Sequence, residues 1–304
     1  ILSCGEEMEG LDFIEALKNL AEKAGVEMEK KQSKDRGEKE ILFEILAAAT
    51  LYFERKLSEN REVSPYLRGR GISEETARNF RLGYAPDGWR NLHQCLKERG
   101  FRESDIEKTG LIIKSSSGFY DRFRNRIIFP IADPSGRIIA FSGRIFGEKE
   151  EGAKYVNSPQ TILYDKSQVL YGFDKAKSSI RQKDKCVLVE GQMDLVLSHQ
   201  AGITSTVALS GTALSERHLK QIKRLTPNII MAFDSDKAGF SASRRSLSLI
   251  LDNAMEAQVI LMPLGLDPAD IAGQDPKKWE IMISEPKHVI NFYLDLIDMQ
   301  PNGP

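Results

Sequence analysis

The second half of the chain has the most regular pattern of hydrophobic and polar positions. Strands are predicted at residues 186–190, 205–209, 228–233 and 257–262, and the first and third of these segments contain apolar runs that end next to acidic residues. Segments of helical period separate them, at about 192–201, 215–225 and 238–252. Unbroken apolar runs are typical of strands that are buried on both faces, as in a parallel sheet. The series therefore predicts repeated βαβ units and an α/β fold.

The first half has a different pattern. Apolar positions at helical spacing predict helices over about 12–25 and 41–57, and the charged residues 29–40 between them predict a flexible linker. Residues 111–146 contain apolar runs joined by turn sequences, which predicts antiparallel strands. Beyond Asp270 the period is helical again, including the segment that starts at His288.

These changes of pattern predict a parallel sheet with a preceding α+β subdomain and a following helical segment. We expect the divisions to be 1–40, a helix and charged linker; 41–182, a basic α+β subdomain; 183–272, the sheet subdomain; and 273–304, the start of a helical subdomain.

Three acidic residues follow strands of the predicted sheet directly. Glu190 ends the first run, and Asp234 and Asp236 follow the third. Ligands bind at the carboxyl ends of strands in such sheets, and clustered carboxylates repel one another unless a cation joins them. Oxygen ligands of this kind favour Mg²⁺ or Mn²⁺. Each acid also precedes a helix and is a candidate N-cap, an alternative that stays open above all for Asp194.

Composition and charge exclude several classes of protein. The chain is 41% hydrophobic with a net charge of −1, and no apolar run approaches the ~20 residues that cross a bilayer. Acidic residues near the N-terminus do not resemble a signal peptide, and three scattered cysteines favour a reducing cytoplasm. Between residues 119 and 181, basic residues outnumber acidic ones and alternate with aromatic residues, a composition that suits single-stranded nucleic acid.

Several longer motifs are more specific than these patterns. The segments VEGQMDLVLSHQAGI, VALSGTAL, FDSDKAGFSASRR and GLDPAD, together with YLRGRGIS, YDRFRNRIIFPIAD and KYVNSPQT, resemble bacterial DnaG-type DNA primases. The resemblance extends from about Ile41 to Asp270. It implies a TOPRIM fold and a DNA-directed RNA polymerase, a nucleotidyltransferase that makes short RNA primers for DNA replication on single-stranded DNA.

The resemblance also implies the site residues. Catalysis is assigned to Glu190, Asp234 and Asp236, which would hold two or more Mg²⁺ or Mn²⁺ ions, with Asp267, Asp194 and Asp270 as further ligands. Two such ions activate the attacking 3′-hydroxyl and stabilise the departing pyrophosphate. The nucleotide and template contacts are expected at Arg70, Arg122, Arg144, Lys154, Tyr155, Asn157, Lys166, Gly191, Gly211, Thr212 and Lys237.

The same resemblance implies the partners. We expect a single-stranded DNA template and ribonucleoside triphosphates, in the bacterial replisome of the cytoplasm, with no membrane. The zinc-ribbon domain and the helicase-binding domain of the family have no counterpart in the sequence, and Cys4 lacks partners, so we expect no zinc in this chain. The zinc ribbon and the replicative helicase would act through those missing regions.

Two other functions remain open at this point. A TOPRIM nuclease or topoisomerase-like phosphoesterase would use a similar acidic set, although a topoisomerase needs a further DNA-gate domain with a tyrosine nucleophile. A non-catalytic TOPRIM DNA-binding module would not need the acidic set, which this chain retains at Glu190, Asp234 and Asp236.

Overall fold

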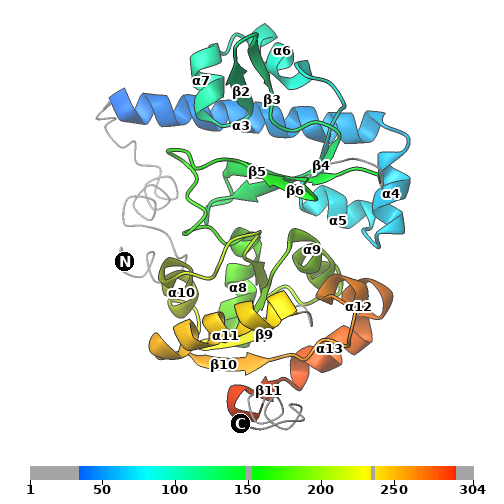
Figure 1. Cartoon of the computed structure of the whole chain (residues 1–304), viewed down its shortest axis with the longest axis vertical. Coiled ribbons are helices and arrows are strands. Elements are labelled where there is room, and N and C mark those ends of the chain that lie inside the picture. The colour runs from blue at the N-terminus through cyan, green and yellow to red at the C-terminus, as the bar shows by residue number, and fades with distance from the viewer. Residues whose placement is uncertain (1–33, 148–152, 234–236, 292–304) are drawn as a thin grey trace, which may run out of the picture. The chain divides into compact units, whose positions relative to one another are not determined.

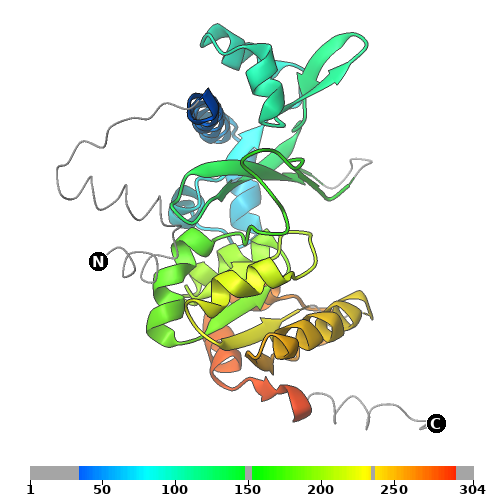
Figure 2. The ribbon, with the colours of Figure 1, turned by 90° about the vertical axis from the view of Figure 1, so that its left-hand side faces the viewer.

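The computed structural model describes residues 34–147, 153–233 and 237–291, which form two compact units, 34–166 and 167–291 (Figures 1 and 2). The helix predicted over 12–25 lies outside the described residues. The predicted division of the chain into segments 1–40, 41–182, 183–272 and 273–304 stays a prediction. Within the described ranges, no helix is both long and apolar enough to span a membrane.

The first unit is built around one long helix. Its sheet has the order β1-β4-β5-β6 and is antiparallel throughout. The strands are β1 (Gly83–Ala85), β4 (Arg126–Ala132), β5 (Ile138–Ile145) and β6 (Tyr155–Asn157), and a hairpin is formed by β2 (Ile112–Ser115) and β3 (Gly118–Asp121). The helices are α3 (Lys34–Glu59), α4 (Val63–Gly69), α5 (Glu74–Asn79), α6 (Asn91–Glu98) and α7 (Glu103–Lys108). The predicted change to antiparallel strands is confirmed.

Helix α3 runs between the sheet on one side and α6, α7 and the β2–β3 hairpin on the other (Figures 1 and 2). Its apolar residues share one core with all of these elements, and the Phe53 ring packs edge-on against that of Phe141, with centroids 5.4 Å apart. Strand β1 approaches closely at Gly83, where a Cβ atom would lie 2.4 Å from the Cβ of Phe53. Only glycine fits this crossing of helix and strand.

The predicted linker 29–40 is partly wrong, because α3 begins at Lys34 rather than near residue 41. Glu38 forms an ion pair with Lys108 of α7, and this interaction raises the pKa of the lysine. Glu and Lys are also good helix formers, so the apolar part of α3 extends readily into the charged segment. The absence of apolar residues concealed this extension.

The second unit contains the predicted α/β sheet, in the order β11-β10-β9-β7-β8. The strands are β7 (Cys186–Val189), β8 (Thr206–Ala208), β9 (Asn228–Ala232), β10 (Glu256–Val259) and β11 (Lys287–His288), and the first four are mutually parallel. The helices are α8 (Phe173–Lys183), α9 (Gln192–Gln200), α10 (Glu216–Lys223), α11 (Lys237–Asp252), α12 (Pro268–Gln274) and α13 (Pro276–Ser284). The parallel βαβ series is confirmed.

Both faces of this sheet are buried. Cys186 and Leu188 share a core with residues of α8, α10 and α11, while Val187 and Val189, which alternate with them along β7, are equally inaccessible. This double burial explains the continuous apolar runs in the sequence. The helix expected from His288 begins one residue later, at Val289, and continues to residue 291, where the described range ends; His288 itself lies in β11, which pairs antiparallel with β10. A two-residue edge strand leaves no periodic signal.

Candidate functional site

Glu190 lies at the carboxyl edge of the parallel sheet, directly after β7. Strand β7 pairs with β8 on one side and β9 on the other, and Val189 is in register with both Ala208 and Ala232. The backbone carbonyl of Glu190 accepts a hydrogen bond of 2.9 Å from the Ser210 N–H, which holds the strand end against the next loop. The position is therefore central in the sheet. Asp234 and Asp236, predicted beside it, lie outside the described residues.

The loop that follows β8 includes two of the predicted nucleotide contacts, Gly211 and Thr212. Ser210 has a φ of 57° and Gly211 a φ of 81°, so two consecutive residues adopt the left-handed conformation. This conformation is favourable for glycine and strained for most other residues. The loop geometry thus accounts for the glycine in structural terms, and its contact with nucleotide stays a prediction.

Asp194 has a structural role. Its carboxylate accepts hydrogen bonds from the N–H of Gly191, at 3.0 Å, and from the N–H of Ala269, at 3.2 Å. The side chain is 7% exposed, and it joins the N-termini of α9 and α12. Of the two alternatives that the sequence left open, the cap is observed. The same contact places Gly191 at the N-cap of α9.

Asp267 and Asp270 cap α12 reciprocally. The Asp267 carboxylate accepts from the Asp270 N–H at 2.7 Å, and the Asp270 carboxylate accepts from the Asp267 N–H at 3.2 Å. This arrangement is a capping box with aspartate at both positions. Helix α12 packs on α9, so these acids are held in the same unit as Glu190.

The acids fit a divalent metal site in chemistry, since carboxylate oxygens are the ligands that Mg²⁺ and Mn²⁺ prefer. Among the described residues, however, no three His, Cys, Asp or Glu side chains are grouped closely enough to hold an ion. The predicted set of Glu190, Asp234 and Asp236 therefore stays a prediction, because two of its members lie outside the described residues. Asp194 and Asp270 each have a carboxylate oxygen that already accepts a backbone hydrogen bond.

The antiparallel sheet brings four of the predicted template residues together. Arg144 on β5 is in register with Tyr155 on β6, and Ser142 is in register with Asn157. The carbonyl of Lys154 accepts a hydrogen bond of 3.0 Å from the Ile145 N–H. Tyr155 and Asn157 thus lie on the short strand β6 beside Arg144, and Lys154 directly precedes that strand.

Arg144 is a buried cation. Its side chain is 7% exposed, and its guanidinium donates a hydrogen bond from Nη1 to the Tyr66 hydroxyl and lies 5.7 Å from the centre of the Tyr66 ring. Within the described part of the chain no carboxylate forms an ion pair with it. A buried charge without a counter-charge is costly unless an anion neutralises it. Arg70, also predicted in this group, lies 5.7 Å from the same ring.

Other predicted residues are placed apart from this group. The Arg122 Nε donates to the Gly110 carbonyl at 2.6 Å, and burial lowers the pKa of its guanidinium. Lys166 is half-buried at the end of the first unit, and Lys237 begins α11 with its side chain outside the described residues. The structure thus groups Arg70, Arg144, Lys154, Tyr155 and Asn157 more closely than the others.

One exposed aromatic residue was missed. Trp89 is 64% exposed, the Arg124 guanidinium lies 4.1 Å from its ring centre, and the Tyr120 ring meets it edge-on at 5.5 Å. Asp121 forms hydrogen bonds to two members of this stack. Its N–H donates to the Trp89 carbonyl at 2.7 Å, and its carbonyl accepts from the Arg124 guanidinium at 2.6 Å. The sequence holds two signals that could have found it: basic residues alternate with aromatic residues near Tyr120, and the segment GYAPDGW, which ends at Trp89, resembles a primase segment.

Asp121 is the last residue of β3, and its buried carboxylate lies at the start of α6. Its carboxylate accepts hydrogen bonds from the N–H groups of Leu92, at 2.8 Å, and His93, at 2.9 Å. Burial raises the pKa of this carboxyl to about 6. The Trp89 stack therefore rests on a residue that is fixed on both its backbone and its side chain.

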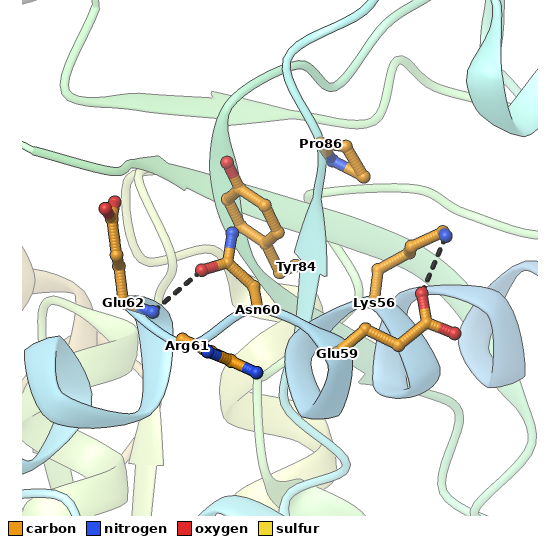
Figure 3. Close-up of a pocket in the computed structure, with 7 residues that line it drawn as sticks. All are labelled: Lys56, Glu59, Asn60, Arg61, Glu62, Tyr84 and Pro86. Atoms are coloured by element: carbon orange, nitrogen blue, oxygen red, sulfur yellow. Dashed lines mark hydrogen bonds and ion pairs between the residues drawn. The ribbon is translucent and has the colours of Figure 1, made fainter.

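A surface hollow of about 470 Å³ lies where α3 meets α4 (Figure 3). It is lined by Lys56, Glu59, Asn60, Arg61, Glu62, Tyr84 and Pro86. Lys56 and Glu59 form an ion pair of 2.7 Å, and the remaining charges of the lining are one basic and one acidic residue. This balanced lining offers no net attraction to phosphates, in contrast to Arg144 and Arg70.

Comparison with known proteins gives a consistent result. Residues 52–177 match a family model described as the N-terminal domain of the DNA primase catalytic core, and residues 187–272 match a Toprim-like model. A DNA primase of Deinococcus radiodurans is 39% identical over 277 residues, which cover 89% of this chain and 47% of that protein. A DNA primase of Myxococcus xanthus is 36% identical over 300 residues, which cover 97% and 49%.

Solved structures agree. The RNA polymerase domain of Mycobacterium tuberculosis primase DnaG has a TM-score of 0.79 and 31% identity, covering 88% of this chain and 89% of that one. A DnaG primase catalytic domain bound to single-stranded DNA has a TM-score of 0.76 and 28% identity, covering 88% and 85%. The chain spans about half the length of the curated relatives it matches.

Proposed function

The chain belongs to the family of bacterial DnaG-type DNA primases, and on this premise we propose that it is the core that synthesises RNA primers on single-stranded DNA. The TOPRIM sheet would carry the chemistry of nucleotidyl transfer, and the antiparallel unit would bind the template. The substrates would be ribonucleoside triphosphates, selected by base pairing with the template rather than by the protein.

The observation that carries this proposal is the buried Arg144, which has no carboxylate partner in the described part of the chain. A phosphate group is the anion that would neutralise it, and a guanidinium suits phosphate in geometry. Lys154 and Arg70 extend the positive charge beside it, and Tyr155 offers a ring for stacking. A nucleic-acid strand supplies both phosphates for the cations and bases for the ring.

The Trp89 stack adds a second support for a single strand. An exposed tryptophan that is already stacked with an arginine can stack with an unpaired base, whichever base it is, because every base has a π-face. Phosphate contacts and stacking do not read sequence. We therefore expect this chain to bind single strands weakly and with little sequence preference, near 10⁻⁴–10⁻⁶ M at physiological salt.

On the sheet edge, Glu190, Asp234 and Asp236 would hold divalent ions, with Asp267 beside them. When bound, such ions neutralise charge on the reacting oxygens and activate the hydroxyl nucleophile. The protein's own part is to keep Glu190 at the central strand end, where its backbone is fixed by Ser210. Asp194 and the Asp267–Asp270 pair keep the N-termini of α9 and α12 in place around that edge.

The test is incubation of the chain with single-stranded DNA, labelled ribonucleotides and Mg²⁺ or Mn²⁺. RNA products support the proposal. Cleaved DNA without RNA would indicate a nuclease, and binding without either product would indicate a binding module. Templates that differ only in one trinucleotide should give similar yields. Adding a primase zinc-ribbon domain should introduce a preference among these templates, because we assign the choice of the initiation site to that domain and synthesis to this chain. Sharp discrimination among the templates by the chain alone would contradict this assignment.

A further inference from the structure

Tyr66 connects two cations that are far apart in the chain. It lies on α4, one turn before Arg70, which follows the helix, and its hydroxyl accepts the hydrogen bond of Arg144 from β5. Both guanidinium groups lie 5.7 Å from the Tyr66 ring centre. Two like charges on one ring repel each other, so the ring must supply attraction to both.

A second tyrosine in the same unit provides a natural comparison. The Tyr52 ring on α3 also has two cations beside it, with Arg55 at 5.9 Å and Lys56 at 5.8 Å. Both of these cations pair with Glu59, at 3.5 and 2.7 Å. Neither Arg70 nor Arg144 has such an ion pair within the described residues. The cations beside Tyr52 therefore share a carboxylate on the same helix, whereas neither cation beside Tyr66 pairs with a carboxylate among the described residues, so an external anion would balance their charge.

The Tyr66 ring is itself held in place by an aromatic frame. It meets the Phe146 ring edge-on at 5.1 Å, and Phe146 meets Tyr84 at 5.4 Å. The Tyr84 hydroxyl donates to Asn125 at 2.9 Å, and the Phe146 N–H donates to the Asn125 carbonyl at 3.0 Å. Asn125 adopts a left-handed conformation with a φ of 46°. Tyr66 is thus fixed independently of the two arginines.

We propose that Tyr66 is a positioning residue, which holds the guanidinium groups of Arg70 and Arg144 together as one phosphate-binding pair. This inference rests on the proposed function, in which these arginines bind the template. The ring would orient both groups, and the N–H donors that the Tyr66 hydroxyl does not use would bind phosphate oxygens. Cation–π attraction also offsets part of the cost of burying Arg144.

The experiment measures single-strand affinity across a range of salt concentrations for Tyr66→Leu and Tyr66→Phe. Tyr66→Leu removes the ring and should weaken binding about tenfold at low salt, the size of a partly desolvated cation–π contribution, and flatten the salt dependence. Tyr66→Phe keeps the ring and loses only the hydroxyl that accepts the Arg144 hydrogen bond. We therefore expect this variant to bind single strands about threefold more weakly at low salt. Tyr52→Leu and Tyr52→Phe are the matched controls, and both should keep the wild-type salt dependence.

The decisive step repeats Tyr66→Leu in an Arg70→Ala/Arg144→Ala background. If Tyr66 acts through the arginines, the substitution should have no further effect there. An undiminished loss in that background, or an unchanged salt dependence in Tyr66→Leu itself, would overturn the positioning role while leaving template binding intact. Wild-type binding by the double-arginine variant would instead overturn both the positioning role and the placement of the template. Because Tyr66→Phe keeps the aromatic packing, it provides the readout if Tyr66→Leu fails to fold.

Discussion

The predicted site residues of the two units are held in different ways. In the parallel-sheet unit, Asp194 and Asp267 are held by backbone N–H groups at helix N-termini. In the antiparallel unit, Arg144 and Arg70 are held by an aromatic ring, without an ion-pair partner in the described ranges. The backbone contacts of these acids fix two helix starts, whereas the two arginines have no counter-charge among the described residues. Glu190 differs from the other acids, since it is placed by its strand rather than by a cap.

The largest effect is expected from Glu190→Gln, which tests the chemical side of this comparison. Removing one carboxylate from an acidic edge should lower primer synthesis by about 100- to 1000-fold, as the loss of a single preorganised electrostatic group does in other active sites. The melting temperature should not fall, because the substitution also removes charge repulsion. Synthesis and melting are measured on the same preparation. Wild-type synthesis would refute the assignment, and a large loss of melting temperature would make the residue structural.

Asp194→Ala should show the reverse pattern. It leaves two backbone N–H groups near the buried edge without their acceptor, at a cost of about 2–4 kcal/mol in the free energy of unfolding. Asp194→Asn keeps one acceptor oxygen and should lose less. Denaturant unfolding followed by circular dichroism gives both values. Equal stability of all three proteins would mean that the Gly191 and Ala269 contacts do not support the fold.

The third test removes charge from the antiparallel unit, at Arg144, Lys154 and Lys166 together. Each phosphate contact in a single strand contributes about 0.7 to the slope of log K against log salt, so the slope should fall by about 2. Affinity at 0.1 M salt should drop by about a hundredfold, equally for all sequences.

The control for this triple variant replaces three exposed cations that face carboxylates. These are Arg78, Lys97 and Lys220, which lie 3.9, 3.0 and 4.0 Å from their acidic partners. Their removal should leave the slope unchanged. A control that weakens binding as much as the triple variant would show that net charge alone determines affinity, and would remove the basis for a defined template path.

The smallest effect is expected at Trp89, whose contribution is stacking rather than charge. Trp89→Ala should cost about 1–3 kcal/mol of binding free energy and leave the salt slope unchanged. Trp89→Phe, which keeps a smaller ring, should lose less. Fluorescence anisotropy with a labelled single strand measures both quantities. A change in slope without a change in affinity at high salt would mean that Arg124, not the indole, makes the contact.

Local pattern determined much of this protein. The four parallel strands of residues 186–259 follow from apolar runs alone, because a strand buried on both faces needs no partner in the sequence to be recognised. The position of Glu190 at a strand end follows in the same way, since it depends on residues within a few positions, whereas the N-cap role of Asp267 was found only in the structure. The primase motifs then indicated the family, and the comparisons confirmed it.

Only the tertiary structure decided which distant side chains meet. Arg144 and Tyr66 are 78 residues apart in the chain, and no periodic pattern predicts that the Arg144 guanidinium donates a hydrogen bond to the Tyr66 hydroxyl. Glu38, in the first turns of α3, pairs with Lys108 of another helix, and β11 is an edge strand that pairs with β10. The Trp89 stack likewise depends on the β2–β3 hairpin meeting α6. In each case the two partners are tens of residues apart in the chain, whereas periodic patterns relate residues only a few positions apart. These contacts therefore depend on tertiary packing.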